Sequence, residues 1–207
     1  MNLANKLTLL RILLVPVLVI CLLPERKAIP SLPVVLSRYM ALLVFIGAAI
    51  TDYYDGKIAR ARGLITNFGR LMDPLADKLL LAAAFIAFVG LDLFPAWFVI
   101  IILFREFLVT GLRTLGTTRG RVIQADAWGK HKTTWQMATI ITTLSFLAIR
   151  DTLMSFNLWE GRPLHGQELE WWFHHVVLAI LIAICLVLTV LSGTLYVVRN
   201  WDLVREE

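Results

Sequence analysis

Four aspartates between two long apolar runs are the residues of this chain best suited to do chemistry. Asp52 and Asp55 are three residues apart, and Asp73 and Asp77 are four residues apart. Residues at these spacings share one face of a helix. A charged side chain at the centre of a bilayer costs roughly 2.5–3.5 kcal/mol, so acidic groups gathered beside apolar runs indicate a function.

The chemistry that these aspartates suit is the binding of hard divalent cations. Carboxylate oxygens prefer Mg²⁺, Mn²⁺ or Ca²⁺ to zinc. Four of them can hold a pair of ions about 3.5–4 Å apart, an arrangement that stabilises phosphoryl transfer. Gly56 and Gly69 leave room for a ligand beside the backbone, and Arg60 offers a bidentate donor to a phosphate. The residues predict a metal-bound pyrophosphate, and they do not say which carboxylate would act as a base.

Two other interpretations of the aspartates stay open. Acids near a membrane surface can be solvated helix ends, with Asp73 capping a helix that begins at Pro74. Acids within a membrane can also line a path for cations or protons. Such a path would distribute its acids through the membrane depth, whereas these gather at one end of the apolar runs.

The elements that must position these side chains are membrane-spanning helices. The chain has 207 residues, 58% of them hydrophobic, and a mean hydropathy of +0.75, whereas soluble domains have about 45–50% apolar residues. Long apolar runs predict one all-α integral membrane domain over residues 1–207. We expect six transmembrane helices, at 5–23, 33–61, 69–90, 94–116, 128–149 and 171–199. A polar segment, 150–170, separates the last two, and we assign it no role.

Charge asymmetry predicts the orientation of these helices. Most of the lysines and arginines fall on the side that holds both termini and the aspartates, and positive residues favour the cytoplasm. We therefore expect a multi-pass protein of the cell (inner, cytoplasmic) membrane, with both termini and the active site facing the cytoplasm. The same asymmetry explains the net charge of +5 without a nucleic-acid partner. Residues 1–23 lack a small-x-small cleavage site, so we expect a retained helix there rather than a signal peptide.

The aspartates belong to a longer pattern, D-x2-D-G-x2-A-R-x8-G-x3-D-x3-D, which runs from Asp52 to Asp77. Each position matches the signature of the CDP-alcohol phosphatidyltransferase family, which this chain resembles. The resemblance implies a six-helix, homodimeric enzyme that transfers a phosphatidyl group from a CDP-linked donor, releases CMP and uses Mg²⁺ or Mn²⁺, with two ions. It implies metal binding by Asp52, Asp55, Asp73 and Asp77, with Asp77 also as the general base. It further implies a CDP moiety bordered by Asp55, Gly56, Ala59, Arg60, Gly69 and Asp73.

A second group of residues predicts an anionic acceptor. Arg105 and Arg113 are eight residues apart on similar faces of one helix, and Lys130 and Lys132 begin the next helix. Arginine and lysine together suit a phosphate dianion. The blocks 105–113 and 129–136, with the opening block 5–11, resemble a bacterial branch of the family. That resemblance implies CDP-diacylglycerol as the donor and glycerol 3-phosphate as the acceptor, held by Arg105, Arg113, Lys130 and Lys132.

Other functions stay open beside this interpretation. Within the family the acceptor can be phosphatidylglycerol, inositol phosphate or serine. A membrane prenyltransferase also binds a diphosphate through aspartates and Mg²⁺, and a cation-coupled transporter would bind ions without releasing CMP. Basic residues near a cytoplasmic surface also contact anionic lipid headgroups, which is what we expect of Arg119 and Arg121. For Arg113 and Lys132 we expect substrate phosphate instead. Arg105 can alternatively pair with Glu106 or another acid as a structural contact.

Overall fold

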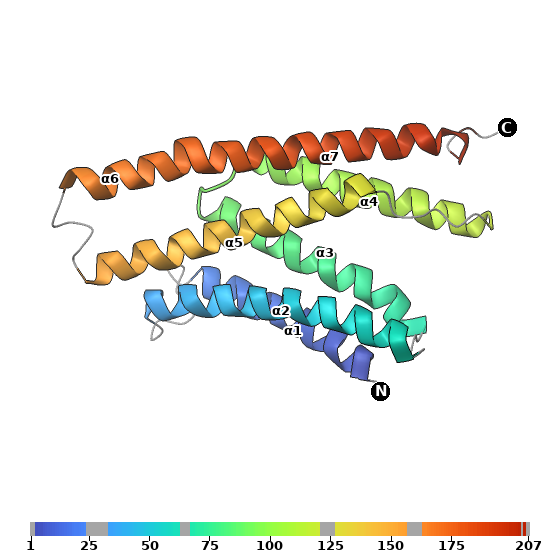
Figure 1. The fold of residues 1–207 in the computed structure, drawn as a ribbon, viewed down its shortest axis with the longest axis horizontal. Coiled ribbons are helices and arrows are strands. Elements are labelled where there is room, and N and C mark those ends of the chain that lie inside the picture. Colours follow the sequence, from blue (N-terminus) through green and yellow to red (C-terminus); the bar gives the residue numbers. More distant parts are fainter. Residues whose placement is uncertain are drawn as a thin grey trace. The chain divides into compact units, whose positions relative to one another are not determined.

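A computed structural model describes residues 3–23, 33–62, 67–120, 127–156, 163–203 and Arg205. Within these ranges the regular structure is helical throughout (Figure 1). The helices are α1 (Leu3–Leu22), α2 (Val34–Arg62), α3 (Asn67–Gly90), α4 (Ala96–Thr118), α5 (Ala127–Ser155), α6 (Pro163–Trp172), the π-helical η2 (Phe173–Leu178), α7 (Ala179–Arg199) and the short 3₁₀ turn η3 (Trp201–Leu203).

Each of the six predicted apolar runs is helical, but two of the predicted ends are wrong. Helix α5 continues to Ser155, and the last helical rod begins at Pro163, so the polar break predicted over 150–170 is shorter. Proline is favoured at the first position of a helix because its fixed φ angle suits it. Arg150 lies inside α5, where hydrogen bonds to Asp151 and Glu170 satisfy its charge.

Three helical segments in the described part of the chain are long and apolar enough to cross a membrane. They are Val34–Thr51, Trp128–Ser155 and Glu168–Arg199, and Leu7–Leu22 is a shorter apolar helix. Large apolar side chains on these helices point outward, for example Leu43 and Val198. A helix that satisfies its own backbone hydrogen bonds and exposes apolar side chains fits a lipid environment. The fold is therefore consistent with a helical membrane protein.

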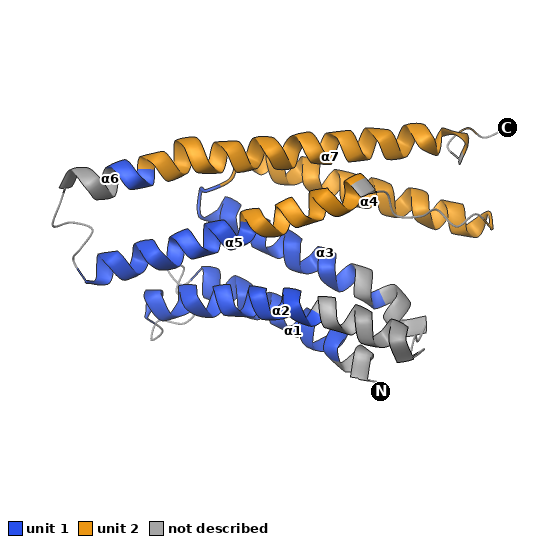
Figure 2. Cartoon of the chain, in the orientation of Figure 1, with its two compact units in different colours: residues 1–93, 140–170 blue, residues 94–139, 171–207 orange. Residues whose placement is uncertain are grey.

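The chain forms two compact units, coloured separately in Figure 2. Unit 1 comprises residues 1–93 and 140–170, and unit 2 comprises residues 94–139 and 171–207. In unit 1, α1 packs against both α2 and α3. In unit 2, α4 packs against α7, and both helices run in the same direction (Figure 1).

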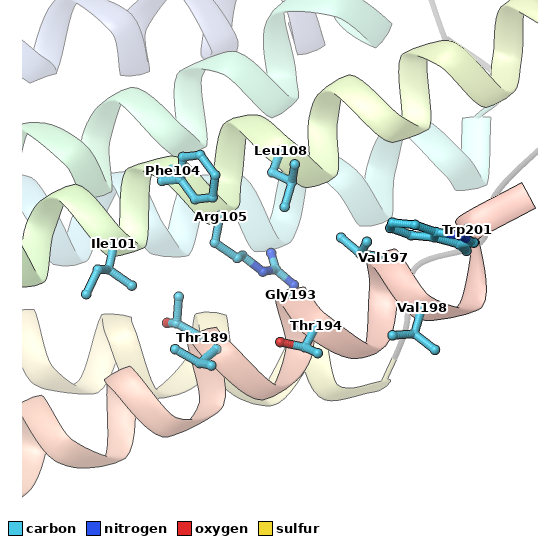
Figure 3. Close-up of a pocket in the computed structure, with 11 residues that line it drawn as sticks. Ile101, Phe104, Arg105, Leu108, Thr189, Gly193, Thr194, Val197, Val198 and Trp201 are labelled. Carbon is cyan, nitrogen blue, oxygen red and sulfur yellow. The ribbon is translucent and has the colours of Figure 1, made fainter. Parts of the chain in front are cut away.

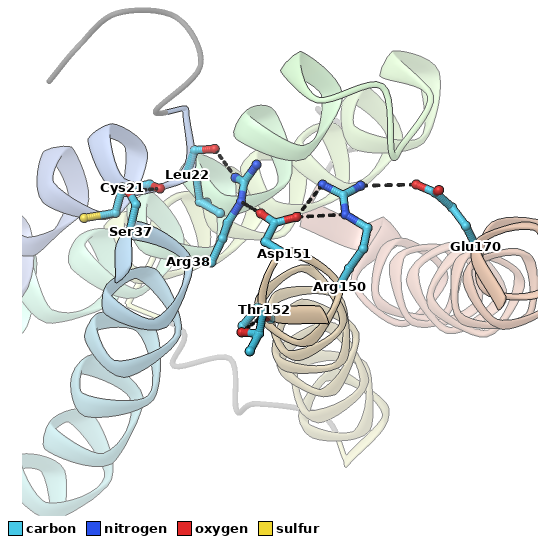
Figure 4. A network of polar contacts seen from close by, with 9 residues as sticks. Cys21, Leu22, Ser37, Arg38, Arg150, Asp151, Thr152 and Glu170 are labelled. Atoms are coloured by element: carbon cyan, nitrogen blue, oxygen red, sulfur yellow. Dashed lines mark hydrogen bonds and ion pairs between the residues drawn. The ribbon is translucent and has the colours of Figure 1, made fainter. Parts of the chain in front are cut away.

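A buried polar network ties three helices of unit 1 together (Figure 4). The Arg38 guanidinium on α2 donates from Nε to Asp151 Oδ2 on α5 at 2.9 Å and from Nη1 to the Leu22 carbonyl of α1 at 2.5 Å. Ser37 donates to the Cys21 carbonyl at 2.8 Å. Arg150 then bonds both Asp151 and Glu170. Because the C-terminal carbonyls of α1 have no partner within their own helix, Ser37 and Arg38 both satisfy that end and hold it against α2.

Candidate functional site

Asp77 on α3 is held by an arginine from the first helix. Arg11 Nη1 on α1 donates to Asp77 Oδ1 at 2.5 Å, and both residues lie in unit 1. The Arg11 side chain is 2% exposed, whereas that of Asp77 is 37% exposed. The arginine thus contacts Asp77 from the protein interior, and the carboxylate remains partly exposed on its other side. An ion pair between side chains 66 positions apart in the sequence orients the acid that the sequence motif predicts as the base.

Arg11 is a functional candidate to which the sequence interpretation gave no role. It lies in the opening block 5–11, which carried the resemblance, but no partner for it could be read from that block. A signal was nevertheless present, because an arginine inside an apolar run is costly unless it is paired. Thr8, one helical turn earlier, is also buried in this helix.

The other predicted residues of the aspartate motif lie outside the side chains that the structure describes. They are Asp52, Asp55, Gly56, Ala59 and Arg60, within the bounds of α2, and Gly69 and Asp73, within the bounds of α3. Their roles in metal and CDP binding therefore remain predictions. An all-oxygen donor set fits a hard divalent cation. The described member of that set, Asp77, already accepts a hydrogen bond from a cationic group.

Glu106 joins two of the predicted acceptor-binding cations in the interior of unit 2. Arg105 Nη1 lies 3.1 Å from Glu106 Oε1, and the Lys132 ammonium from α5 bonds the same oxygen. Lys132 is 1% exposed and Arg105 is 11% exposed. Removing one partner of a buried ion pair is strongly destabilising, so Glu106 keeps both cations in place. The sequence placed Glu106 beside Arg105, but the lysine comes from another helix.

Gly193 makes space for the Arg105 side chain, whereas Gly129 is in ordinary contact range of it. A Cβ atom added at Gly193 on α7 would lie 3.0 Å from Arg105 Cγ, and one at Gly129 on α5 would lie 3.6 Å from Arg105 Nη2. Small residues let membrane helices approach closely. Here Gly193 lets an arginine lie between α4 and α7, where it reaches Glu106.

The remaining predicted acceptor-binding cations have a different environment. Arg113 on α4 and Lys130 on α5 are both exposed, although they belong to the same unit as Arg105 and Lys132. The structure therefore brings Arg105 and Lys132 together around Glu106 and leaves Arg113 and Lys130 at the surface of that unit. Unit 2 thus offers both a buried cation pair and surface cations.

Several buried polar atoms of unit 2 have no hydrogen-bond partner among the described residues. They are Arg105 Nε, Gln136 Nε2, Thr189 Oγ1 and Tyr196 Oη. A buried donor or acceptor left unsatisfied costs about 1–3 kcal/mol. Gln136 ends the sequence block 129–136, but Thr189 and Tyr196 carried no sequence signal because they lie within the most apolar helix.

Comparisons with known proteins agree on one family. The sequence matches the family described as CDP-alcohol phosphatidyltransferase over residues 1–197. A CDP-diacylglycerol–glycerol-3-phosphate 3-phosphatidyltransferase of Bacillus subtilis (strain 168) is 37% identical, over 99% of this chain and 97% of the relative. A probable phosphatidylglycerophosphate synthase of Mycobacterium tuberculosis (strain H37Rv) is 37% identical, over 96% and 81%. A Mycoplasma pneumoniae relative with the same name as the Bacillus protein is 36% identical, over 68% and 59%.

Proposed function

The chain belongs to the CDP-alcohol phosphatidyltransferase family, and on this basis we propose that it transfers the phosphatidyl group from CDP-diacylglycerol to sn-glycerol 3-phosphate. The products are phosphatidylglycerol phosphate and CMP. The observation that carries this proposal is the similarity over 99% of the chain to a relative whose name states both substrates. The cations around Glu106, with Arg113, supply the positive charge that a phosphate-bearing acceptor requires.

The proposed protein is a homodimer of six-span subunits in the cell membrane, with both termini and the site on the cytoplasmic side. The three long apolar segments and the shorter apolar helix Leu7–Leu22 support several of these spans. The orientation rests on the distribution of lysine and arginine along the sequence. A donor whose acyl chains stay in the bilayer and an acceptor dissolved in the cytoplasm meet at this surface.

Asp77 is the proposed general base. Its carboxylate takes the proton of the 1-hydroxyl of glycerol 3-phosphate, the hydroxyl oxygen attacks the β-phosphorus of the donor, and CMP departs. The hydrogen bond from buried Arg11 supports this role because it orients a carboxylate that is still partly exposed. Arg11 is accordingly a positioning residue, which acts through Asp77.

Asp52, Asp55, Asp73 and Asp77 are the residues that would hold Mg²⁺ or Mn²⁺, and four carboxylates are enough for two ions. A divalent cation held by these residues would supply positive charge to the pyrophosphate and to the departing CMP. In the same proposal, the CDP moiety is bordered by Asp55, Gly56, Ala59, Arg60, Gly69 and Asp73.

The acceptor phosphate is proposed to bind to the cations of unit 2. Arg113 and Lys130 are exposed and can contact the phosphate directly. Arg105 and Lys132 are buried around Glu106 and contribute positive charge to the interior of the same unit. A phosphate held at this point would orient the 1-hydroxyl for attack.

The test of this proposal is release of CMP by the purified protein in detergent. CDP-diacylglycerol and Mg²⁺ or Mn²⁺ are supplied with one acceptor at a time: glycerol 3-phosphate, phosphatidylglycerol, inositol phosphate or serine. We expect release with glycerol 3-phosphate. Release with a different acceptor alone would overturn the proposed substrate, and no release with any acceptor would favour a transporter.

Replacement of Arg113 with alanine is expected to raise the KM for glycerol 3-phosphate by about 10–100-fold, since a hydrogen bond to a charged group contributes about 1.5–3 kcal/mol. The KM for CDP-diacylglycerol should change less than about twofold, because this proposal gives Arg113 no contact with the donor. Initial-rate kinetics with each substrate varied separately provide the measurement. Arg119→Ala is the matched control, an exposed arginine near the end of the same helix. Equal effects on both KM values would indicate a structural role for Arg113.

A further inference from the structure

A glycine of α7 lies against Arg105, one of the cations proposed to bind the acceptor phosphate. Figure 3 shows the Arg105 side chain extending from α4 toward Gly193. A Cβ atom added at Gly193 would lie 3.0 Å from Arg105 Cγ and 4.0 Å from Arg105 Cβ. Carbon atoms make their best contact at about 3.5–4.0 Å, so the Cγ atom would be crowded. The position of the Arg105 side chain thus depends on the absence of a side chain at Gly193.

Helix α7 is held in place on both sides of Gly193. One turn later, Tyr196 is 3% exposed and packs with Val109 of α4 in a buried apolar cluster. Two turns earlier, a hydrogen bond joins Cys185 Sγ to Thr139 Oγ1 of α5 at 3.2 Å, and both side chains are buried. Closely packed interiors transmit strain instead of absorbing it. A Cβ atom at position 193 would therefore displace the arginine side chain and not the helix.

A displacement of Arg105 Cγ changes the contact at the end of the side chain. The guanidinium lies farther than Cγ from the Cα–Cβ bond, so a rotation about that bond moves it more. Its Nη1 atom lies 3.1 Å from Glu106 Oε1, and N–H···O hydrogen bonds extend to about 3.2 Å. A small rotation away from Glu106 therefore breaks the contact. With 11% of the Arg105 side chain exposed, little water is available to replace it.

Glu106 connects this contact to a second proposed acceptor-binding cation. The same carboxylate oxygen accepts a bond from Lys132 of α5, whose side chain is 1% exposed. Arg105 and Lys132 therefore share one buried anion, which fixes the position of both charges. A misplacement of about 1 Å at a binding group can cost on the order of 100-fold in rate. The space at Gly193 thus affects the geometry of the whole cation pair.

These contacts give a residue of α7 a part in the reaction. We propose that Gly193 is a positioning residue for acceptor binding, because its missing side chain keeps Arg105 on Glu106 and thereby places the cations that attract the acceptor phosphate. This inference rests on the proposed function, in which Arg105 and Lys132 contribute positive charge to acceptor binding. The sequence pattern predicted no site residue after Lys132.

Replacing Gly193 with alanine is expected to raise the KM for glycerol 3-phosphate about tenfold, because a displaced cation loses part of its interaction with the phosphate. The KM for CDP-diacylglycerol should change less than about twofold, because the proposed donor site is formed by the aspartate motif. The measurement is the initial rate of CMP release by the full-length protein in detergent, with each substrate varied separately. A variant that only packs less well would contain less active enzyme, which lowers the apparent kcat and raises neither KM.

Gly47→Ala on α2 is the matched control. A Cβ atom added at Gly47 would meet no atom of another element within 4 Å among the described residues. Both variants replace a glycine inside a helix, where alanine is the better helix former. Gly47→Ala should therefore leave both KM values within about twofold of the wild type. Unfolding followed by circular dichroism reports whether the two variants are equally well folded.

A double-variant cycle tests whether Gly193 acts through Arg105. Arg105→Ala removes the Cγ atom that a Cβ atom at position 193 would crowd. In the Arg105→Ala background, Gly193→Ala should change the KM for glycerol 3-phosphate by less than about twofold, because the two changes share one interaction. A further tenfold rise in that background would mean that Gly193 acts elsewhere, and it would overturn the proposal.

Two other results would also overturn the proposal. If Gly193→Ala left both KM values as unchanged as Gly47→Ala does, Arg105 would not need the space at Gly193. If it raised both KM values equally and destabilised the fold, Gly193 would serve helix packing alone. A failure of the proposed function is distinguishable from these results, because the wild-type protein itself would then release no CMP with glycerol 3-phosphate.

Discussion

Replacing Asp77 with asparagine is expected to lower kcat by about 10²–10⁴-fold, the usual contribution of a general base. Asparagine keeps the size of the side chain and can accept a hydrogen bond from Arg11, but it cannot take the proton of the acceptor hydroxyl. The Arg11 contact approaches from the buried side, so the helix packing around it should be retained. The measurement is CMP release under saturating substrates, together with titration of CDP-diacylglycerol binding, which we expect to be largely intact.

Asp92→Asn is the matched control for this variant. Asp92 is exposed and has a φ angle of 57°, a conformation that asparagine tolerates as well as aspartate does. The same chemical change outside the site should therefore leave kcat within about twofold of the wild type. An Asp77→Asn protein with full activity would refute the assignment of the base. A folded Asp77→Asn protein that no longer binds the donor would assign Asp77 to donor binding instead.

Replacing Arg38 with methionine is expected to lower the free energy of unfolding by about 1–3 kcal/mol, because Asp151 loses its partner from α2 and keeps only Arg150 among the described residues. The Arg38 side chain is 1% exposed and that of Asp151 is 7% exposed, so water cannot replace the lost hydrogen bond. The loss also frees the Leu22 carbonyl at the end of α1. Unfolding in mixed micelles with increasing denaturing detergent, followed by circular dichroism, provides the measurement.

A double variant separates the ion pair from the packing at this point. Arg38→Met combined with Asp151→Leu removes both charges of this pair and leaves Arg150 with Glu170 as its partner. Replacing a buried pair with apolar side chains is often neutral or stabilising. We therefore expect the double variant to be more stable than Arg38→Met alone. Arg119→Met, at an exposed position, should change stability by less than about 0.5 kcal/mol. If Arg38→Met changed stability as little as this control, the network in Figure 4 would not hold the helices together.

Helix positions follow from the sequence because they depend on local patterns. Each of the six predicted apolar runs is helical, since an apolar run of sufficient length satisfies its own backbone only as a helix. The ends of α5 and of the last helical rod were predicted less well. Polar residues such as Arg150 suggest a break, but a partner from another helix lets them remain helical.

The sequence also identified the family, because the aspartate motif places eight residues at set spacing within 26 positions. The full-length similarity to known phosphatidyltransferases confirms that identification. The roles of Asp52, Asp55 and Asp73 stay predictions, since their side chains lie outside the described part of the structure. The motif alone could not show that Arg11 of another helix donates a hydrogen bond to Asp77.

Only the tertiary structure decided which acidic and basic side chains form ion pairs. Arg11 pairs with Asp77 across 66 positions, Lys132 with Glu106 across 26, and Arg38 with Asp151 across 113. Local spacing places a side chain on a helix face, but its partner depends on which helices pack together. In a membrane protein that packing is directed by small residues and buried polar groups. The sequence by itself thus determined the helices and the chemistry of the motif, and helix packing determined how the reactive groups are supported.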